Sequence, residues 1–285
     1  KWHPACATLL IYFKATVMLK NYFRIACRNL WKYKGFSAIN ITGLALGLTC
    51  SLLIFLWVQH ERSIDSFHAN GSQLYKVYAR EYYDGKIDGN YDTPGPMAEE
   101  MKKVVPEVEY ASSLLYINNT TTLKAGEKIL KVAGNAAGAD WFKMFSYPLL
   151  QGNANEVLSS LDGIVLSESL AVKLFGSAAA AMGKNILYDN RKNFTVSGVY
   201  ADLKDNVSFR YDFLISWQAY RKESSFVNEW ANSGPLTFVM LRKNADPVAV
   251  EKKIQHFRDS YSPGNPKVYH VEYGLQPFRN TYLHT

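Results

Sequence analysis

The sequence predicts an α+β protein in which an amphipathic helix and one transmembrane helix precede a mixed α+β domain. Three observations predict this: a long uncharged apolar stretch near the N-terminus, a basic flank before it, and a charge-balanced remainder of short alternating strands and helices. Of the 285 residues 48% are hydrophobic, so the chain can bury a sizeable core.

The apolar stretch carries the strongest signal. Between Gly35 and His60 no side chain is acidic or basic other than that of His60 itself. Within it, Ser37–Val58 would form a helix about 33 Å long, enough to cross a hydrocarbon core of about 30 Å. A buried core helix is the alternative, but such helices seldom run this far without a charge. We therefore predict a membrane span over residues 37–59.

A basic flank precedes the span and sets its orientation. Residues 1–36 hold seven Lys and Arg residues and no acid, which leaves 25 basic and 25 acidic residues for the rest of the chain. A nucleic-acid-binding surface would need its basic excess on the folded domain, so no nucleic-acid partner is expected. Basic residues beside a span mark its cytoplasmic end, so residues 60–285 are expected on the outer face.

Residues 18–36 have their own pattern. Basic side chains recur every four residues while apolar ones fill the other face, which predicts a cytoplasmic amphipathic helix lying on membrane lipids. The alternative is that residues 18–36 are a solvated segment whose positive charge only marks the cytoplasmic side of the span. The basic residues are Lys20, Arg24, Arg28 and Lys32.

Residues 1–17 begin with Lys and contain only a short apolar run, Leu9–Phe13. We expect them to be an upstream extension that is not native, with Met18 as the natural start. The three cysteines, Cys6, Cys27 and Cys50, precede the large domain and are too far apart for a metal motif.

Residues 60–285 read as one extended α+β domain, with a division into two lobes left open. Turn residues separate short runs with strand or helix patterns. The expected strands are Leu74–Tyr83, Lys86–Tyr91, Ser112–Tyr116, Thr120–Lys124, Ile129–Val132, Ile164–Leu166, Asn185–Tyr188, Phe194–Tyr200, Phe213–Ser216 and Thr237–Leu241. The expected helices are Thr93–Val104, Ala139–Phe145, Glu168–Phe175 and one from Asp246 that carries Val250, Ile254, Phe257 and Tyr261 on one face.

No motif in the chain supports catalytic, cofactor-binding or metal-binding residues. The segment Gly176–Asn185 has six residues between its glycines and Asn after the lysine, so it fails as a phosphate-binding loop and reads as a helix end and turn. Asp84, Asp88 and Asp92 recur every fourth residue, whereas calcium-binding loops place a ligand at every second residue. No calcium site is therefore expected at these residues. An enzyme is therefore not expected, and neither is a cofactor.

Small residues line one face of the predicted span. Gly43, Gly47 and Ser51 recur every four residues, and Asn40 lies near the edge of the groove they form. Such grooves let another helix approach closely, and a polar side chain such as that of Asn40 is costly against lipid. We expect this face to pack against a partner helix.

Several ordered motifs resemble a known family. The run Arg28–Leu44 resembles the start of ABC permeases of the FtsX-like, macrolide-exporter (MacB) type, in the long form found in Bacteroidetes-like bacteria. Ile164–Gly176, Met182–Ile186 and Phe194–Val199 follow in the order of that family's periplasmic core domain, and Ala139–Phe145 also fits. Met182 stands where the family usually has Pro or Val, a minor departure.

The resemblance implies the permease subunit of an ABC transporter. Such a subunit pairs with a separate ABC ATP-binding subunit and a second permease subunit, and couples ATP hydrolysis to periplasmic movement for export, lipoprotein release or mechanotransmission. It lies in the bacterial inner membrane with its core domain in the periplasm, where further partner proteins are left open. Permeases of this type have later transmembrane helices, so we expect the chain to be incomplete beyond Thr285.

Two other functions stay open at this point. The first is a single-pass membrane sensor or adaptor with an extracytoplasmic binding domain, which would dimerise through Gly43 and Gly47. The second, ranked third, is a membrane-anchored hydrolase with a dispersed active site.

Overall fold

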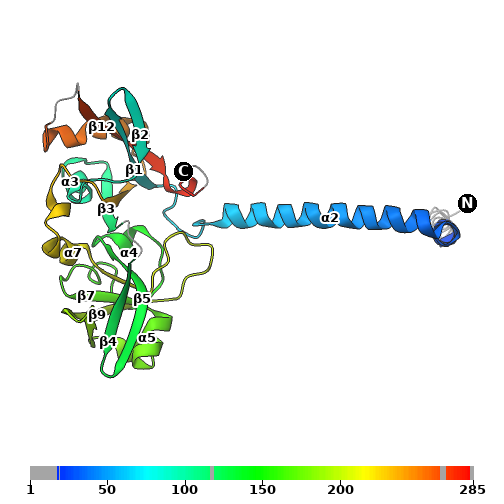
Figure 1. Ribbon diagram of the computed structural model, residues 1–285, viewed down its shortest axis with the longest axis horizontal. Coiled ribbons are helices and arrows are strands. Elements are labelled where there is room, and N and C mark those ends of the chain that lie inside the picture. The colour runs from blue at the N-terminus through cyan, green and yellow to red at the C-terminus, as the bar shows by residue number, and fades with distance from the viewer. Residues whose placement is uncertain (1–17, 19, 116–118, 264–267, 283–285) are drawn as a thin grey trace, which may run out of the picture. The chain divides into compact units, whose positions relative to one another are not determined.

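The computed structural model describes residues 18, 20–115, 119–263 and 268–282 (Figure 1). The chain divides into two compact units, residues 1–62 and 63–285. The predicted extension, residues 1–17, lies outside the described residues.

The described residues of the first unit are helical. Residues 20–32 form one helix, and α2 runs from Lys34 to Ser63. Among the described residues, α2 is the one helix that is long and apolar enough to cross a membrane. None of its residues is buried, and charges occur only near its ends. The helix contains the predicted span of residues 37–59 and extends a few residues beyond it on each side.

A closed six-stranded barrel forms one part of the second unit. Its order is β10-β7-β9-β8-β4-β5, and β5 pairs with β10 to close the ring. The pairs β10–β5 and β7–β9 are parallel, and the other four are antiparallel. The strands are β4 (Asn119–Ala125), β5 (Lys128–Ala137), β7 (Gly163–Ser167), β8 (Asn185–Tyr188), β9 (Lys192–Tyr200) and β10 (Phe213–Ser216).

The barrel closes around a filled interior. Inward side chains such as those of Leu123, Phe194 and Phe213 are almost completely buried, as expected for a small barrel. Phe213 pairs in register with Gly134, and a Cβ on Gly134 would lie 2.0 Å from the Phe213 ring. Glycine is therefore required where the closing strands meet.

An antiparallel sheet forms the other part. Its order is β3 (Val108–Leu115), β11 (Pro235–Leu241), β1 (Leu74–Tyr83) and β12 (Tyr269–Pro277), and β2 (Lys86–Asn90) also pairs with β1. The sheet joins the barrel where Leu114 of β3 pairs with Ala137 of β5. On one face it packs against α3 (Met97–Val104) and α8 (Pro247–Ile254).

Aromatic side chains fill the space between barrel and sheet. The short helix α4 (Trp141–Met144) contributes the fully buried Trp141, which packs with Phe145 and with Phe238 of β11. Tyr200 at the end of β9 belongs to the same core. The remaining short elements are β6 (Leu149–Gln151), α5 (Glu168–Phe175), α6 (Ala178–Ala181), α7 (Trp217–Glu223), η1 (Phe226–Asn228), η2 (Phe257–Ser260) and η3 (Phe278–Asn280).

The strongest local signals predicted element bounds correctly. β1, β8, β10 and α5 begin and end at the predicted residues. In α5, Ser167 accepts a hydrogen bond from the Leu170 amide, and Gly176 ends the helix in the left-handed conformation at φ 89°. These are the usual chemical signals of helix ends.

Several predictions were wrong in detail. α3 begins at Met97 rather than at Thr93, because the Thr93 hydroxyl is buried against β11, where it bonds the Pro235 carbonyl at 2.8 Å. The helix from Asp246 ends at Ile254, so Phe257 lies on the following 3₁₀ turn, although it reaches the same core. The elements α6, α7, β6 and β12 were not predicted.

Candidate functional site

The four residues predicted to pack against a partner helix lie in α2. At 3.6 residues per turn, Asn40, Gly43, Gly47 and Ser51 fall within about 80° of the helix circumference. All four are exposed, and nothing lies within 4 Å of a Cβ placed at either glycine. The structure thus brings these residues to one open face, while the partner helix remains a prediction.

Ser51 is not a free donor on this face. Its hydroxyl donates to the Gly47 carbonyl at 2.8 Å, within its own helix. Close approach of a second helix would therefore depend on backbone contact at Gly43 and Gly47, with Asn40 as the polar group nearby.

The four basic residues of the predicted stripe lie on the first helix of the chain that the structure describes. Lys20, Arg24, Arg28 and Lys32 are exposed on the helix of residues 20–32. The helical hydrogen-bond pattern continues across Tyr33, whose amide donates to the Asn29 carbonyl at 3.1 Å and whose carbonyl accepts from the Ser37 amide at 2.9 Å. Binding to membrane lipids remains a prediction.

A second candidate site lies at the start of the second unit, where α2 ends. We call this the junction: Ser63, Asp65, Asn206 and Ser208. The Asn206 side-chain amide donates to the Ser63 carbonyl at 3.1 Å, and the Asn206 carbonyl accepts from the Asp65 amide at 3.0 Å. The Ser208 amide donates to the Asp65 carboxylate at 2.9 Å. The last residue of α2 is thus bonded directly to the loop of residues 201–212.

The residues after α2 are buried rather than solvated. Asp65 is 2% exposed and adopts a left-handed conformation at φ 56°, which Asp tolerates better than most residues. Burial raises the pKa of the Asp65 carboxyl, although its hydrogen bonds to Ser208 lower it, and its Oδ2 has no partner among the described residues. Asp65 is therefore packed into the second unit, to which it belongs.

His68 holds the same segment in place a few residues further on. Its Nδ1 accepts from the Ser146 amide at 3.1 Å, and its ring packs between Phe67, Phe145 and Phe278. Because Nδ1 accepts, the neutral ring carries its proton on Nε2. Burial lowers the pKa of His68 to about 4, so the ring is neutral at pH 7.

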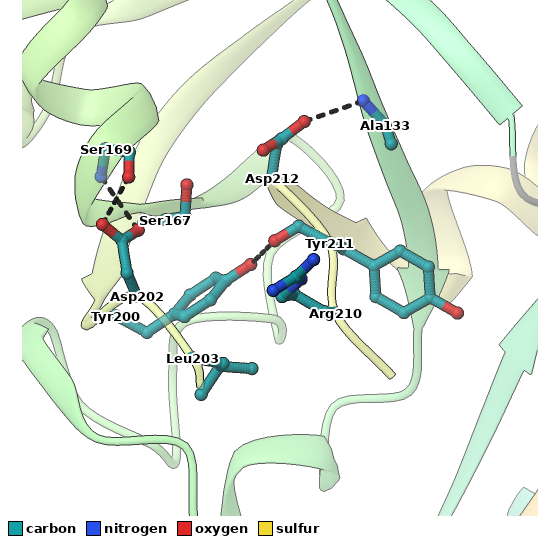
Figure 2. Close-up of a pocket in the computed structure, with 9 residues that line it drawn as sticks. All are labelled: Ala133, Ser167, Ser169, Tyr200, Asp202, Leu203, Arg210, Tyr211 and Asp212. Carbon is teal, nitrogen blue, oxygen red and sulfur yellow. Dashed lines mark hydrogen bonds between the residues drawn. The ribbon is translucent and has the colours of Figure 1, made fainter. Parts of the chain in front are cut away.

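The loop of residues 201–212 is itself bonded to the barrel at both ends (Figure 2). At its start, the Asp202 carboxylate accepts from the amide and the hydroxyl of Ser169 at the beginning of α5. At its end, Asp212 pairs with β5, since its carboxylate accepts from the Ala133 amide at 2.9 Å. Tyr200 of β9 donates to the Tyr211 carbonyl. The loop is therefore bonded to α5, β5 and β9.

These groups surround a hollow of about 430 Å³, which Figure 2 shows. Both of its carboxylates, Asp202 and Asp212, are already bonded to donors on the protein. Burial raises the pKa of Tyr211 to about 12 and that of Tyr200 further, so both phenols keep their protons. These polar groups hold the loop in place. Within the described ranges, no group of three His, Cys, Asp or Glu side chains could hold a metal ion.

Sequence reasoning missed the junction. Its residues are common polar types, and Asp65 and Ser208 are separated by 143 positions. The available signal was the position of Asp65 and His68 directly after an apolar helix, in a segment without glycine or proline before Gly71. Such a segment is more consistent with a stiff connection than with a linker.

The buried histidine predicts a pH dependence of stability. The unfolded chain, with its His pKa near 6.5, binds a proton more readily than folded His68, so acidification favours unfolding. Between pH 7 and pH 5 we expect the free energy of unfolding to fall by roughly 2 kcal/mol through this residue. Urea unfolding of the chain in detergent, followed by tryptophan fluorescence, measures it. The variant His68→Gln keeps an acceptor for the Ser146 amide, and its free energy of unfolding should fall less between pH 7 and pH 5. An equal fall would show that His68 does not cause the pH dependence.

The chain matches a known protein family and is similar in fold to solved structures. The profile of the MacB-like periplasmic core domain matches residues 37–257. A solved domain of a Porphyromonas gingivalis protein described as a permease is 22% identical, covers 74% of this chain and 92% of its own, and has a TM-score of 0.64. The periplasmic region of MacB from Actinobacillus actinomycetemcomitans is 16% identical, with 74% and 90% covered and a TM-score of 0.50. These likenesses show the fold. A search of curated proteins gives no match.

Proposed function

The chain belongs to the MacB-like periplasmic core domain family, and on that basis we propose that it is the permease subunit of an ABC transporter in a bacterial inner membrane. The family consists of periplasmic domains of permeases and is not a family of enzymes. In the proposed arrangement α2 spans the membrane, its N-terminal end faces the cytoplasm, and the barrel and sheet lie in the periplasm.

The junction is the observation that carries the proposed mechanism. A separate ATP-binding subunit in the cytoplasm would move α2, and the movement would have to reach the periplasmic domain. The bonds of Asn206 to Ser63 and of Ser208 to Asp65 would pass this movement to the loop of residues 201–212. The loop of residues 201–212 then carries the movement to α5 and β5 through Asp202 and Asp212.

The exposed face of α2 supports the proposed partners. Large apolar side chains such as Leu44 and Leu53 are more than half exposed, so lipid or protein must cover this helix in a cell. We assign the face of Gly43 and Gly47 to a helix of the permease assembly, including a second permease subunit, and the remaining faces to lipid. The basic residues from Lys20 to Lys32 would lie on anionic headgroups.

Reporter fusions test the proposed orientation. Alkaline phosphatase fused after Lys76 should be active, because it would be exported, while the same enzyme fused after Lys34 should be inactive. Green fluorescent protein at the two positions should give the opposite pattern and serves as the control. Phosphatase activity after Lys34 without activity after Lys76 would contradict the orientation and, with it, the permease proposal.

A further inference from the structure

A groove lies in the first unit, where the helix of residues 20–32 meets α2. Its volume is about 550 Å³, within the range of about 300–1,000 Å³ that ligand pockets usually have. Its walls include Cys27 and Trp31 of the first helix and Lys34, Ser37, Ala38 and Ile41 of α2. Cys27 and Ser37 are half-buried, whereas every other residue from 20 to 60 is exposed. The two helices therefore enclose this side of the turn at Tyr33.

The groove carries a positive charge that has no counter-ion nearby. No acidic residue precedes Glu61 in the sequence. Because an α-helix rises 1.5 Å per residue, Glu61 lies about 40 Å along α2 from Lys34. The Lys34 ammonium lies 5.2 Å from the centroid of the Trp31 ring, a cation–π contact that leaves its net charge uncompensated. The charge of the groove is therefore complementary to an anionic occupant.

The other end of the groove is apolar. Lys34 comes before the proposed span of residues 37–59, so in a membrane it would lie at the depth of the lipid headgroups. Ile41 is about 10 Å further along α2, at the depth of the acyl chains, and is 56% exposed. A phospholipid has the same order of groups, with a charged phosphate at one end and apolar chains at the other. A free phosphate ion would leave the wall of Ala38 and Ile41 uncovered.

The groove uses neither of the surfaces already assigned in this unit. On α2 its residues centre about 125° around the helix from the face of Gly43 and Gly47. The nearest member of the basic stripe, Lys32, does not line it. We propose that this groove binds one phospholipid with an anionic headgroup, whose phosphate meets the Lys34 ammonium while an acyl chain lies against Ala38 and Ile41. The depth of the site in the membrane rests on the proposed function.

Native mass spectrometry of the full chain in detergent tests the site. Phosphatidylglycerol and phosphatidylcholine with identical acyl chains are the probes, because they differ in net charge but not in apolar surface. One phosphatidylglycerol should bind about fivefold more tightly than phosphatidylcholine. Equal affinities would show that the groove does not recognise negative charge and would overturn the proposal. The assay does not depend on the orientation that the reporter fusions test, so either result can fail alone.

A matched pair of charge variants separates the groove from the basic flank. Lys34→Gln should weaken phosphatidylglycerol binding about fivefold, which corresponds to about 1 kcal/mol, the contribution of one Lys near anionic lipid. Lys32→Gln removes the same charge two residues away but outside the groove, so the affinity should change less than twofold. An equal loss in both variants would mean that lipid is attracted by the basic flank as a whole, and no site would remain.

A second pair of variants tests the apolar wall. Ala38→Phe fills the groove and should weaken the binding of both lipids. Ala45→Phe places the same ring on the same side of α2, about 10 Å further along and outside the groove, so it should leave both affinities unchanged. Circular dichroism checks that the variants keep their helical content. If Ala38→Phe binds both lipids as tightly as the wild type, the acyl chain does not lie in this groove and the proposal is wrong.

Discussion

Breaking the junction should uncouple the periplasmic domain from α2. The double variant Asn206→Ala and Asp65→Gly removes the side-chain bonds to Ser63 and Ser208, while glycine still accepts the left-handed conformation of residue 65. Losing these bonds lowers local stability by about 1–2 kcal/mol, so amide exchange around residues 63–69 and 201–212 should accelerate roughly 5- to 30-fold. Exchange detected by mass spectrometry measures this directly.

Loss of the hydrogen bonds at the junction should also impair function. In a permease that contains this chain, reconstituted with its ATP-binding subunit, the double variant should lose most ATP-driven transport or force transmission, while ATP hydrolysis continues. Asp65→Asn keeps both the acceptor oxygen and the tolerance for positive φ, so it should retain activity.

Asn232→Ala is the matched control for Asn206, because Asn232 also donates from its side chain to a backbone carbonyl, that of Phe226, outside the junction. If the double variant still couples ATP hydrolysis fully to transport or force transmission, the junction is not part of the mechanism. A wild-type protein that shows no ATP dependence at all would favour the sensor or adaptor function.

Filling the groove on α2 should weaken helix packing without preventing membrane insertion. Gly47→Leu places a large side chain where no atom now lies within 4 Å of a Cβ, so it blocks a partner helix and adds apolar surface that favours insertion. Helix association in lipid depends on close approach and on hydrogen bonds of about 0.6–2 kcal/mol each. We expect self-association in a membrane two-hybrid assay to fall roughly 3- to 30-fold.

Two control variants make the groove test specific. Ala45→Leu is an equivalent small-to-large change on the opposite side of α2, about 160° away. Leu53→Ala alters a position expected to face lipid. If either control reduces association as much as Gly47→Leu does, the groove has no packing role and α2 is only an anchor.

Local signals explain which parts of the domain could be predicted. The bounds of α5 follow from Ser167 and Gly176, whose roles depend only on neighbouring backbone groups. β12 carried no comparable signal, because it ends in Pro277 and includes Gly274. In the structure Gly274 lies opposite Tyr78 of β1, and a Cβ at that position would lie 2.2 Å from the Tyr78 ring. Pairing with β1, nearly 200 residues earlier in the chain, makes β12 a strand.

The candidate sites differ in the same way: one depends on local sequence signals and the other on contacts between distant segments. The face of Gly43 and Gly47 was predictable because a helix of known pitch places every fourth residue on one side. The junction was not predictable, since its hydrogen bonds join Asp65 to Ser208, which is 143 positions away in the chain.

The sequence by itself determined the long apolar helix, its basic flank and the order of most short strands, because hydropathy, charge and turn chemistry act over a few neighbouring residues. The tertiary structure alone decided that β10 returns to β5 to close the barrel, and that Asp65 is buried beneath the loop of residues 201–212. Those outcomes depend on which distant strands pair and which polar groups lose their water, and both are set by packing across the whole domain.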